Sequence, residues 1–277
     1  MVVLPAPFGP SSAVTVPAAA DHEAPSTAVV VANDLRSSRT RTAPVTARHP
    51  RLAVMPRIDR EAAPATMVAA APAALALLLG RPRTAAVLGV LPVAVAAFFR
   101  DPERTPDHAT VPVDDVLAPA DGKVMHAGAG QEGVAPEGEW QQVSIFLSAF
   151  DVHINRTPYG GRVVEVAERP GKWLAAYKHE SAHLNERSDI TVERQVGDEL
   201  RRVHFRQIVG LMARRVVTRV SEADELTTGQ RVGLMKFGSR MDVFVPPECD
   251  LLVSTGDRVV AGETVIARWA RPTQVTG

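Results

Sequence analysis

The fold class is decided by the run Gln142-Val143-Ser144-Ile145-Phe146-Leu147, which is rich in β-branched and aromatic residues. Such a run is typical of a β-strand. Three more runs of this kind follow at Gly161–Val166, Ser188–Glu193 and Met241–Val245, separated by glycine and proline residues. Strand-like runs do not alternate with long helices, which argues against a doubly wound parallel sheet. The sequence therefore predicts a mainly β (α+β) fold for residues 101–277.

The C-terminal tail, Thr255–Ala267, indicates how this β domain is built. Its turns around Gly256 and Gly262 are similar to the hairpin turns of barrel-sandwich modules such as lipoyl and biotinyl domains. We expect Leu117–Val124 to form the complementary half, with the intervening residues as inserted segments. The predicted architecture is a barrel-sandwich-like β domain with insertions.

Composition excludes several classes of function. The chain has 277 residues, with 31 Lys plus Arg and 31 Asp plus Glu. The absence of a basic excess argues against a general nucleic-acid binder. The single cysteine, Cys249, excludes an internal disulfide and a cysteine-rich zinc site. We expect Cys249 to be a small apolar residue.

The N-terminal region has little that could form a core. Residues 1–64 show no sustained helical or strand periodicity, so we expect a disordered extension. The first 20 residues lack the basic start of a secretory signal. Recognisable organisation begins only after Met55, which leaves either Met1 or Met55 as the start of translation.

Residues 65–100 are expected to form an apolar helical hairpin. The runs Ala65–Leu79 and Thr84–Phe99 flank the charged break Arg81-Pro82-Arg83. Each run is shorter than the roughly 20 residues of a full transmembrane helix. We expect the hairpin to associate with a membrane by dipping into one leaflet, and a spanning hairpin or two helices buried in a soluble core are the alternatives.

The charges beside this hairpin suggest its orientation. Basic residues flank both ends, at Arg57, Arg60, Arg100 and Arg104. Because cytoplasmic flanks carry the excess of Lys and Arg, a peripheral or monotopic location on the cytoplasmic face of the cell membrane is expected.

The segment Leu234–Phe244 contains a candidate site of self-cleavage, Gly238-Ser239. Glycine has no Cβ, so strained backbone angles and close approach to its carbonyl are allowed. Attack by the Ser239 hydroxyl would convert the amide to an ester, and elimination with hydrolysis would leave a pyruvoyl group. Gly-Ser dipeptides more often mark turns, so the dipeptide alone does not decide between the two interpretations.

Two upstream residues could assist this chemistry. Serine is a weak nucleophile that needs a base, and His153 is a candidate because histidine titrates near neutral pH. Asp121 could orient His153 or stabilise its cation, as in a catalytic triad. Taken singly, Asp121-Gly122 is a turn signal and His153 is a polar strand position.

The order of five motifs resembles that in phosphatidylserine decarboxylases, in the short bacterial proenzyme form. The resemblance covers roughly residues 65–270. The motifs are Leu117–Val124, Ser144–Pro158, Asn185–Arg187, Gly210–Arg215 and Phe237–Arg240.

This resemblance implies a complete function. Cleavage would leave a large fragment ending at Gly238 and a small one beginning with a pyruvoyl group made from Ser239, and the fragments would stay together. Asp121, His153 and Ser239 would be the catalytic residues. The covalent pyruvoyl would accept electrons during conversion of phosphatidylserine to phosphatidylethanolamine. The membrane surface is an implied partner, whereas oligomeric state and the choice between acyl and ether lipids stay open.

Two residues around the predicted cut depart from the family pattern. Long-form members carry Leu-Gly-Ser-Thr, whereas this chain has Phe237-Gly238-Ser239-Arg240. Short forms vary here, so the departure bears more on the lipid preference than on cleavage.

Two other functions compete with this interpretation. His179-Glu180-Ser181-Ala182-His183 matches the zinc-protease pattern His-Glu-x-x-His, but neither a third ligand nor a long surrounding helix is evident. Lys236, between Met235 and Phe237, resembles the attachment lysine of biotinyl or lipoyl-type carriers. We expect no metal in the decarboxylase. Arg214 and Arg215 are either a solvated basic pair or a phosphate contact.

Overall fold

The computed structural model describes residues 57–104, 111–211, 215–236 and 238–270. Residues 1–56, including Met1, Met55 and most of the predicted extension 1–64, lie outside the described part. The chain divides into two units, Met1–Pro50 and Arg51–Gly277, and every described residue belongs to the second.

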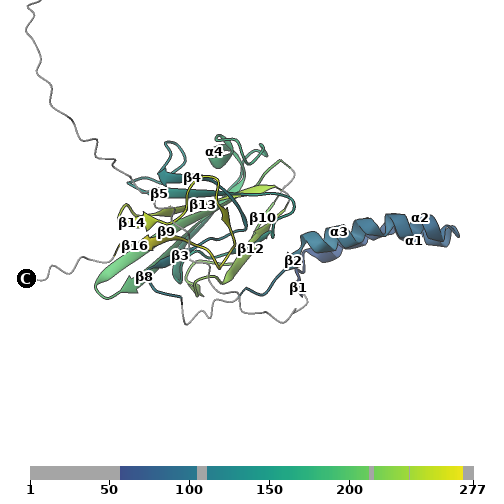
Figure 1. Ribbon diagram of the computed structural model, residues 1–277, viewed down its shortest axis with the longest axis horizontal. Coiled ribbons are helices and arrows are strands. Elements are labelled where there is room, and N and C mark those ends of the chain that lie inside the picture. Colours follow the sequence, from purple (N-terminus) through teal and green to yellow (C-terminus); the bar gives the residue numbers. More distant parts are fainter. Residues whose placement is uncertain (1–56, 105–110, 212–214, 237, 271–277) are drawn as a thin grey trace, which may run out of the picture. The chain divides into compact units, whose positions relative to one another are not determined.

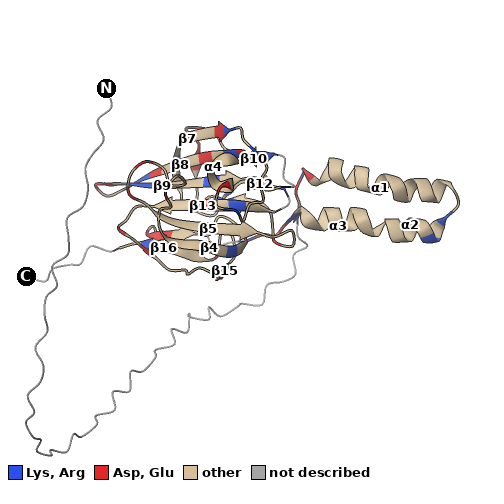
Figure 2. Ribbon diagram, turned by 90° about the horizontal axis from the view of Figure 1, so that it is seen from above, with Lys and Arg blue, Asp and Glu red and all other residues tan. Residues whose placement is uncertain are grey.

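Three helices cover the apolar region. They are α1 (Ala62–Leu78), α2 (Pro82–Leu88) and α3 (Val90–Phe98). Pro82 begins α2, where its fixed φ and missing N–H are tolerated. Helix α1 contacts both α2 and α3, and Figure 2 shows it running alongside them. No helix within the described ranges is long and apolar enough to cross a membrane.

The largest sheet has eight strands, all paired antiparallel, and it is curled into a half-barrel (Figure 1). Its order is β11-β7-β8-β9-β13-β5-β4-β15. In chain order the strands are β4 (Gly122–Ala129), β5 (Gln141–Leu147), β7 (Gly161–Arg169), β8 (Arg187–Val196), β9 (Glu199–Ile208), β11 (Glu225–Leu226), β13 (Ser239–Val245) and β15 (Arg258–Val259).

Smaller sheets complete the β structure. One has the order β10-β12-β6, another β14-β16-β3, and β1 pairs with β2. The strands are β1 (Arg57–Ile58), β2 (Arg100–Asp101), β3 (Asp115–Leu117), β6 (Ile154–Arg156), β10 (Val216–Thr218), β12 (Arg231–Met235), β14 (Cys249–Leu251) and β16 (Val265–Trp269). A short helix, α4 (Ser181–Leu184), precedes β8.

The prediction of a mainly β fold is confirmed, and the four strand-like runs fall within β5, β7, β8 and β13. Strand β13 begins at Ser239, two residues before the predicted start. Strand β9 was not predicted, because three arginines and a histidine interrupt its apolar pattern. In the tail, β15 pairs with β4 and β16 pairs with β3.

The main core lies on one face of the large sheet. Side chains alternate between the two faces of a strand, and Met241, Val243 and Val245 of β13 all belong to this core. Ser239 occupies the next position on the same face. The opposite face carries Arg240, which forms a buried ion pair with Asp242 at 2.7 Å.

Candidate active site

Ser239 lies at the start of a central strand and is completely buried. It is opposite Leu147, the last residue of β5. Its Oγ has no hydrogen-bond partner among the described residues. Since buried polar groups are rarely left unsatisfied, this hydroxyl requires an explanation, and a reactive role supplies one.

The residue before Ser239 has a left-handed backbone conformation. Gly238 has φ +64°, in the left-handed region that glycine adopts without a steric penalty. Its carbonyl oxygen lies directly against the Cα of Gly210, where any Cβ would overlap it. A Cβ at Gly210 would also approach Cβ of Ala176 to 3.3 Å. Gly210 therefore fixes the position of the Gly238 carbonyl.

His153 is a buried, neutral base. It is 2% exposed, and its ring lies 4.2 Å from that of Phe98, measured between centroids. Its Nδ1–H donates to the main-chain oxygen of Asp151 at 3.0 Å, which leaves Nε2 as the proton acceptor. Nε2 is buried and has no hydrogen-bond partner within the described ranges. Burial lowers the pKa of His153 to about 4, so the ring is uncharged at neutral pH.

Strand pairing brings His153 and Ser239 to the same end of the β structure. Met235 ends β12, and its N–H donates to the carbonyl oxygen of His153 at 3.3 Å. Ser239 begins β13 opposite Leu147, where the connection that carries His153 leaves β5. His153 lies on the connection between β5 and β6. Met235, the end of β12, is bonded to this connection at His153, and Ser239, the start of β13, pairs with Leu147 where the connection begins.

Asp121 is also at this end, but its carboxylate binds elsewhere. It precedes Gly122, which lies one residue beyond the Lys123–Phe146 pair. Gly122 and Ser239 therefore flank Leu147, about 10 Å apart for two strand spacings. Both oxygens of Asp121 accept hydrogen bonds from Arg104, with 2.6 Å for Nη2 to Oδ2, and Oδ1 also accepts the N–H of Ala261 at 2.9 Å.

The structure therefore assembles the three predicted residues differently from a triad. No hydrogen bond between described atoms joins Asp121 to His153, and the contact that orients the ring comes from the carbonyl of Asp151. The charge of Asp121 raises the pKa of His153, but burial outweighs it. The catalytic roles of Asp121, His153 and Ser239 stay predictions.

The sequence of this chain is similar to those of known proteins. The family model described as "Phosphatidylserine decarboxylase" matches residues 92–267, more than half of the chain. The chain belongs to the phosphatidylserine decarboxylase family. It is similar to proteins named "Phosphatidylserine decarboxylase proenzyme" from Pelobacter propionicus, at 45% identity over 62% of this chain and 74% of the relative, and from Symbiobacterium thermophilum, at 44% over 77% and 96%. The relative from Erythrobacter litoralis is 40% identical over 77% of this chain and 88% of its own length.

Membership of the phosphatidylserine decarboxylase family supports a decarboxylase enzyme, and the two competing functions are not supported. Helix α4 begins after His179, so this residue and His183 do not share a helical face, and both are exposed. The described residues contain no group of three potential metal ligands. Lys236, the candidate carrier lysine, forms an ion pair with Glu61 at 3.2 Å. Cys249 is buried in β14, as expected, and burial raises its pKa to about 12.

Several residues of this decarboxylase site were missed in the sequence. Arg104, counted among basic residues that flank the helices, is buried and binds Asp121, so it is not available to a lipid head group. Phe98 belongs to an apolar run, and nothing in its pattern indicates a contact with a distant histidine. Gly210 belongs to the motif Gly210–Arg215, but its close contact with the Gly238 carbonyl becomes visible only in the folded chain.

The motif residue Asn185 ties a loop to the site. Its Nδ2 donates to the carbonyl oxygens of Val209 and Leu174, both at 2.8 Å, and its Oδ1 accepts the N–H of Leu174 at 2.8 Å. Val209 precedes Gly210 and lies beside Ser239 in the sheet, one residue beyond the Ile208–Arg240 pair. Asn185 therefore holds the segment around Leu174 against the strand end that contacts the Gly238 carbonyl.

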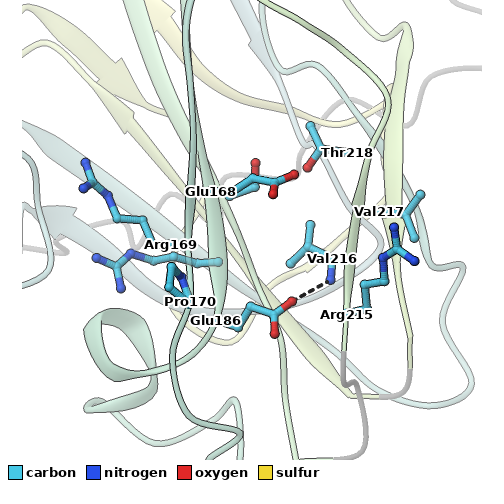
Figure 3. A pocket seen from close by; sticks show the side chains of 10 residues that line it. Glu168, Arg169, Pro170, Glu186, Arg215, Val216, Val217 and Thr218 are labelled. Atoms are coloured by element: carbon cyan, nitrogen blue, oxygen red, sulfur yellow. Dashed lines mark hydrogen bonds between the residues drawn. The ribbon is translucent and has the colours of Figure 1, made fainter.

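A cavity of about 250 Å³ opens where β7 and β8 approach β10 (Figure 3). Arg215 lines it, and Glu186 accepts the N–H of Val216 at 3.4 Å. Ser239, His153 and Asp121 do not line this cavity. Arg214 lies outside the described residues, and no contact in the cavity decides between the two interpretations of Arg215.

The buried state of His153 predicts an unusual pH dependence. Self-cleavage of a fresh precursor is expected to stay near its maximum from pH 7 to about 5 and to fall about tenfold per unit below about pH 4. An ordinary histidine would lose activity near pH 6.5. Below pH 6.5 His153 binds a proton in the unfolded chain, whereas in the folded chain it binds one only below about pH 4. The stability of the fold therefore also declines as the pH falls from 6.5 to about 4. Gel analysis after a pH jump, with circular dichroism as the control for folding, measures this; a midpoint near 6.5 would contradict it.

Proposed function

We propose that this chain is a self-processing, pyruvoyl-dependent decarboxylase that converts phosphatidylserine to phosphatidylethanolamine. The observation that carries the proposal is the buried, unpartnered hydroxyl of Ser239, which directly follows the left-handed Gly238. The relatives' names support the substrate and the proenzyme state.

The residues present fit formation of a pyruvoyl group from Ser239. No hydrogen bond between described atoms joins Nε2 of His153 to Oγ of Ser239. Once the Ser239 side chain turns toward the ring, Nε2 takes the proton of the hydroxyl and Oγ attacks the carbonyl carbon of Gly238. The amide becomes an ester and the amine of residue 239 is freed. Loss of the Ser239 Cα proton then expels the Gly238 carboxylate, and hydrolysis of the resulting dehydroalanine releases ammonia. The large fragment ends at Gly238, and the small one begins with the pyruvoyl.

The pyruvoyl carbonyl supplies an electron sink for the loss of carbon dioxide from an amine-bearing substrate. The chain's own residues exclude water and move protons. Phe98 and the surrounding core keep the ring of His153 dry, and Nε2 carries protons between steps. The Asp121 carboxylate, held in place by Arg104, favours the protonated state of His153 when a proton is in transit.

We infer that residues 101–277 form the decarboxylase domain, with barrel-sandwich-like architecture. The fragments stay together because β13 of the small fragment lies between β5 and β9 of the large one. We propose that residues 65–100 form a peripheral or monotopic membrane hairpin on the cytoplasmic face. Large apolar side chains exposed along this region support that role: Met67, Val68, Leu75, Leu77, Leu78, Leu79, Val87, Val90, Leu91 and Val93.

Two measurements test this function together. Purified enzyme mixed with vesicles of phosphatidylserine should release carbon dioxide and accumulate phosphatidylethanolamine. A hydrazine reagent should label the fragment that begins at residue 239, detected by mass spectrometry, and should abolish turnover. Turnover by an unbroken chain that the hydrazine does not label would overturn the proposal.

A further inference from the structure

Four large apolar side chains stand in solvent on connections near Ser239. They are exposed to 88% at Phe150, 48% at Trp173, 66% at Tyr177 and 67% at Leu211. We call these four residues the apolar rim. An apolar group of this size on a soluble protein commonly marks a binding surface.

Contacts of neighbouring residues place two members of the apolar rim beside the Gly238 carbonyl. Leu211 follows Gly210, which touches the Gly238 carbonyl, and Tyr177 follows Ala176, which approaches Gly210. The Tyr177 ring also packs edge-on against Phe146 at 6.3 Å between centroids. Tyr177 and Leu211 therefore lie beside the same backbone crossing.

The other two members lie on neighbouring connections. Phe150 lies on the β5–β6 connection that carries His153, and its carbonyl accepts a hydrogen bond from Arg100 at the end of α3. Trp173 precedes Leu174, which Asn185 binds to the strand beside Ser239. The apolar rim therefore includes residues from the connection bonded to Arg100 and from the loop that Asn185 ties to the strand beside Ser239.

The charges beside the apolar rim favour a lipid surface. Lys172 and Lys178 are exposed next to Trp173 and Tyr177, respectively. Tyrosine and tryptophan prefer the level of lipid head groups, and nearby lysines are attracted to anionic lipids. Aromatic, aliphatic and basic side chains together are the composition of an interfacial membrane contact.

We propose that the apolar rim is a second membrane contact, formed by the β domain itself and separate from the helices. It seats the region around Ser239 on the lipid surface, so that a two-chain lipid reaches the site without leaving the bilayer. This role rests on the proposed function for its purpose, but the contact itself does not require a processed or active chain.

Tryptophan fluorescence tests the contact independently of catalysis. The probe is a vesicle of phosphatidylcholine mixed with phosphatidylglycerol, added to the uncleaved Ser239→Ala chain. Emission that depends on Trp173, defined by subtracting the spectrum of the Ser239→Ala/Trp173→Phe chain, should shift to the blue and be quenched by brominated lipids. Unchanged Trp173 emission while the chain still sediments with vesicles would overturn the proposal.

A second test removes three members while keeping the helices. The variant Phe150→Ser/Tyr177→Ser/Leu211→Ser should still cut itself, should bind vesicles about tenfold more weakly and should show a raised KM for vesicle substrate, with turnover of a short-chain soluble phosphatidylserine retained. The control is Leu200→Ser, which is 56% exposed at the far end of the β8–β9 hairpin. Equal vesicle affinity for the triple variant and wild type would refute the contact, whether or not decarboxylation is observed.

Discussion

Replacing Ser239 with alanine should leave one unbroken chain where the wild type yields two. The substitution removes the nucleophile, so processing should fall about 10⁴-fold or more, below detection. A denaturing gel and intact-mass spectrometry of both proteins measure this. The wild type should give a fragment that ends at Gly238 and a second that begins at residue 239 with a carbonyl in place of the amine.

The control for this variant is another buried serine. Ser188 is 1% exposed and its Oγ is also unpartnered, but it does not follow a left-handed glycine. Ser188→Ala should therefore cut itself at the wild-type rate. Two fragments from Ser239→Ala, or a single chain from active wild type, would disprove the assignment of Ser239.

Replacing Gly210 with alanine should block self-cleavage in a chain that retains its nucleophile and base. The new Cβ would overlap the carbonyl oxygen of Gly238, so the scissile group must move. Displacing a reacting group by about 1 Å can slow a reaction about 100-fold, and we expect at least that loss. The time course of precursor conversion measures the effect.

A second crowded glycine separates this effect from general destabilisation. A Cβ at Gly160 would meet the main-chain nitrogen of Thr228 at 2.8 Å and the carbonyl oxygen of Leu226 at 3.0 Å, and it would not meet the Gly238 carbonyl. Gly160→Ala should lower the melting temperature but still cleave. If the Gly210→Ala chain melts like the uncleaved Ser239→Ala chain and yet cleaves at the wild-type rate, Gly210 does not position the carbonyl.

The parts of the fold that could be predicted have strong local signals. Strands such as β5 and β13 are rich in apolar residues, and the Gly238-Ser239 dipeptide can be recognised as a candidate site of self-cleavage. Strand β9 could not be predicted because Arg201 and Arg206 are buried by ion pairs with Asp114 and Asp189. Their burial depends on partners that lie far away in the sequence.

In the candidate site, too, residues with a local sequence signal could be predicted, whereas contacts between distant residues could not. His153 and Ser239 were identified as candidates from residue type and motif. The partner of Asp121 is Arg104, whose position in the sequence groups it with the basic residues that flank the helices. A carboxylate–arginine pair separated by 17 residues has no periodic signature in the sequence. The main-chain carbonyl that orients His153 could not be predicted either, because every residue carries one.

Arg240, which departs from the long-form pattern, has a structural explanation. Its side chain points away from the core face, pairs with Asp242 and donates to Oγ of Ser144 at 3.0 Å. It therefore anchors the start of β13, next to Ser239. This location indicates that the variation is compatible with processing.

Because β13 is an interior strand of the large sheet, self-cleavage should change refolding from a unimolecular into a bimolecular reaction. The precursor unfolds and refolds as one molecule, whereas the cut enzyme must recover a strand that has become a separate polypeptide. Its recovery after heating should therefore depend on protein concentration, and dilution should turn a reversible transition into permanent inactivation. The enzyme would be assembled once, during its first folding, and not renewed afterwards.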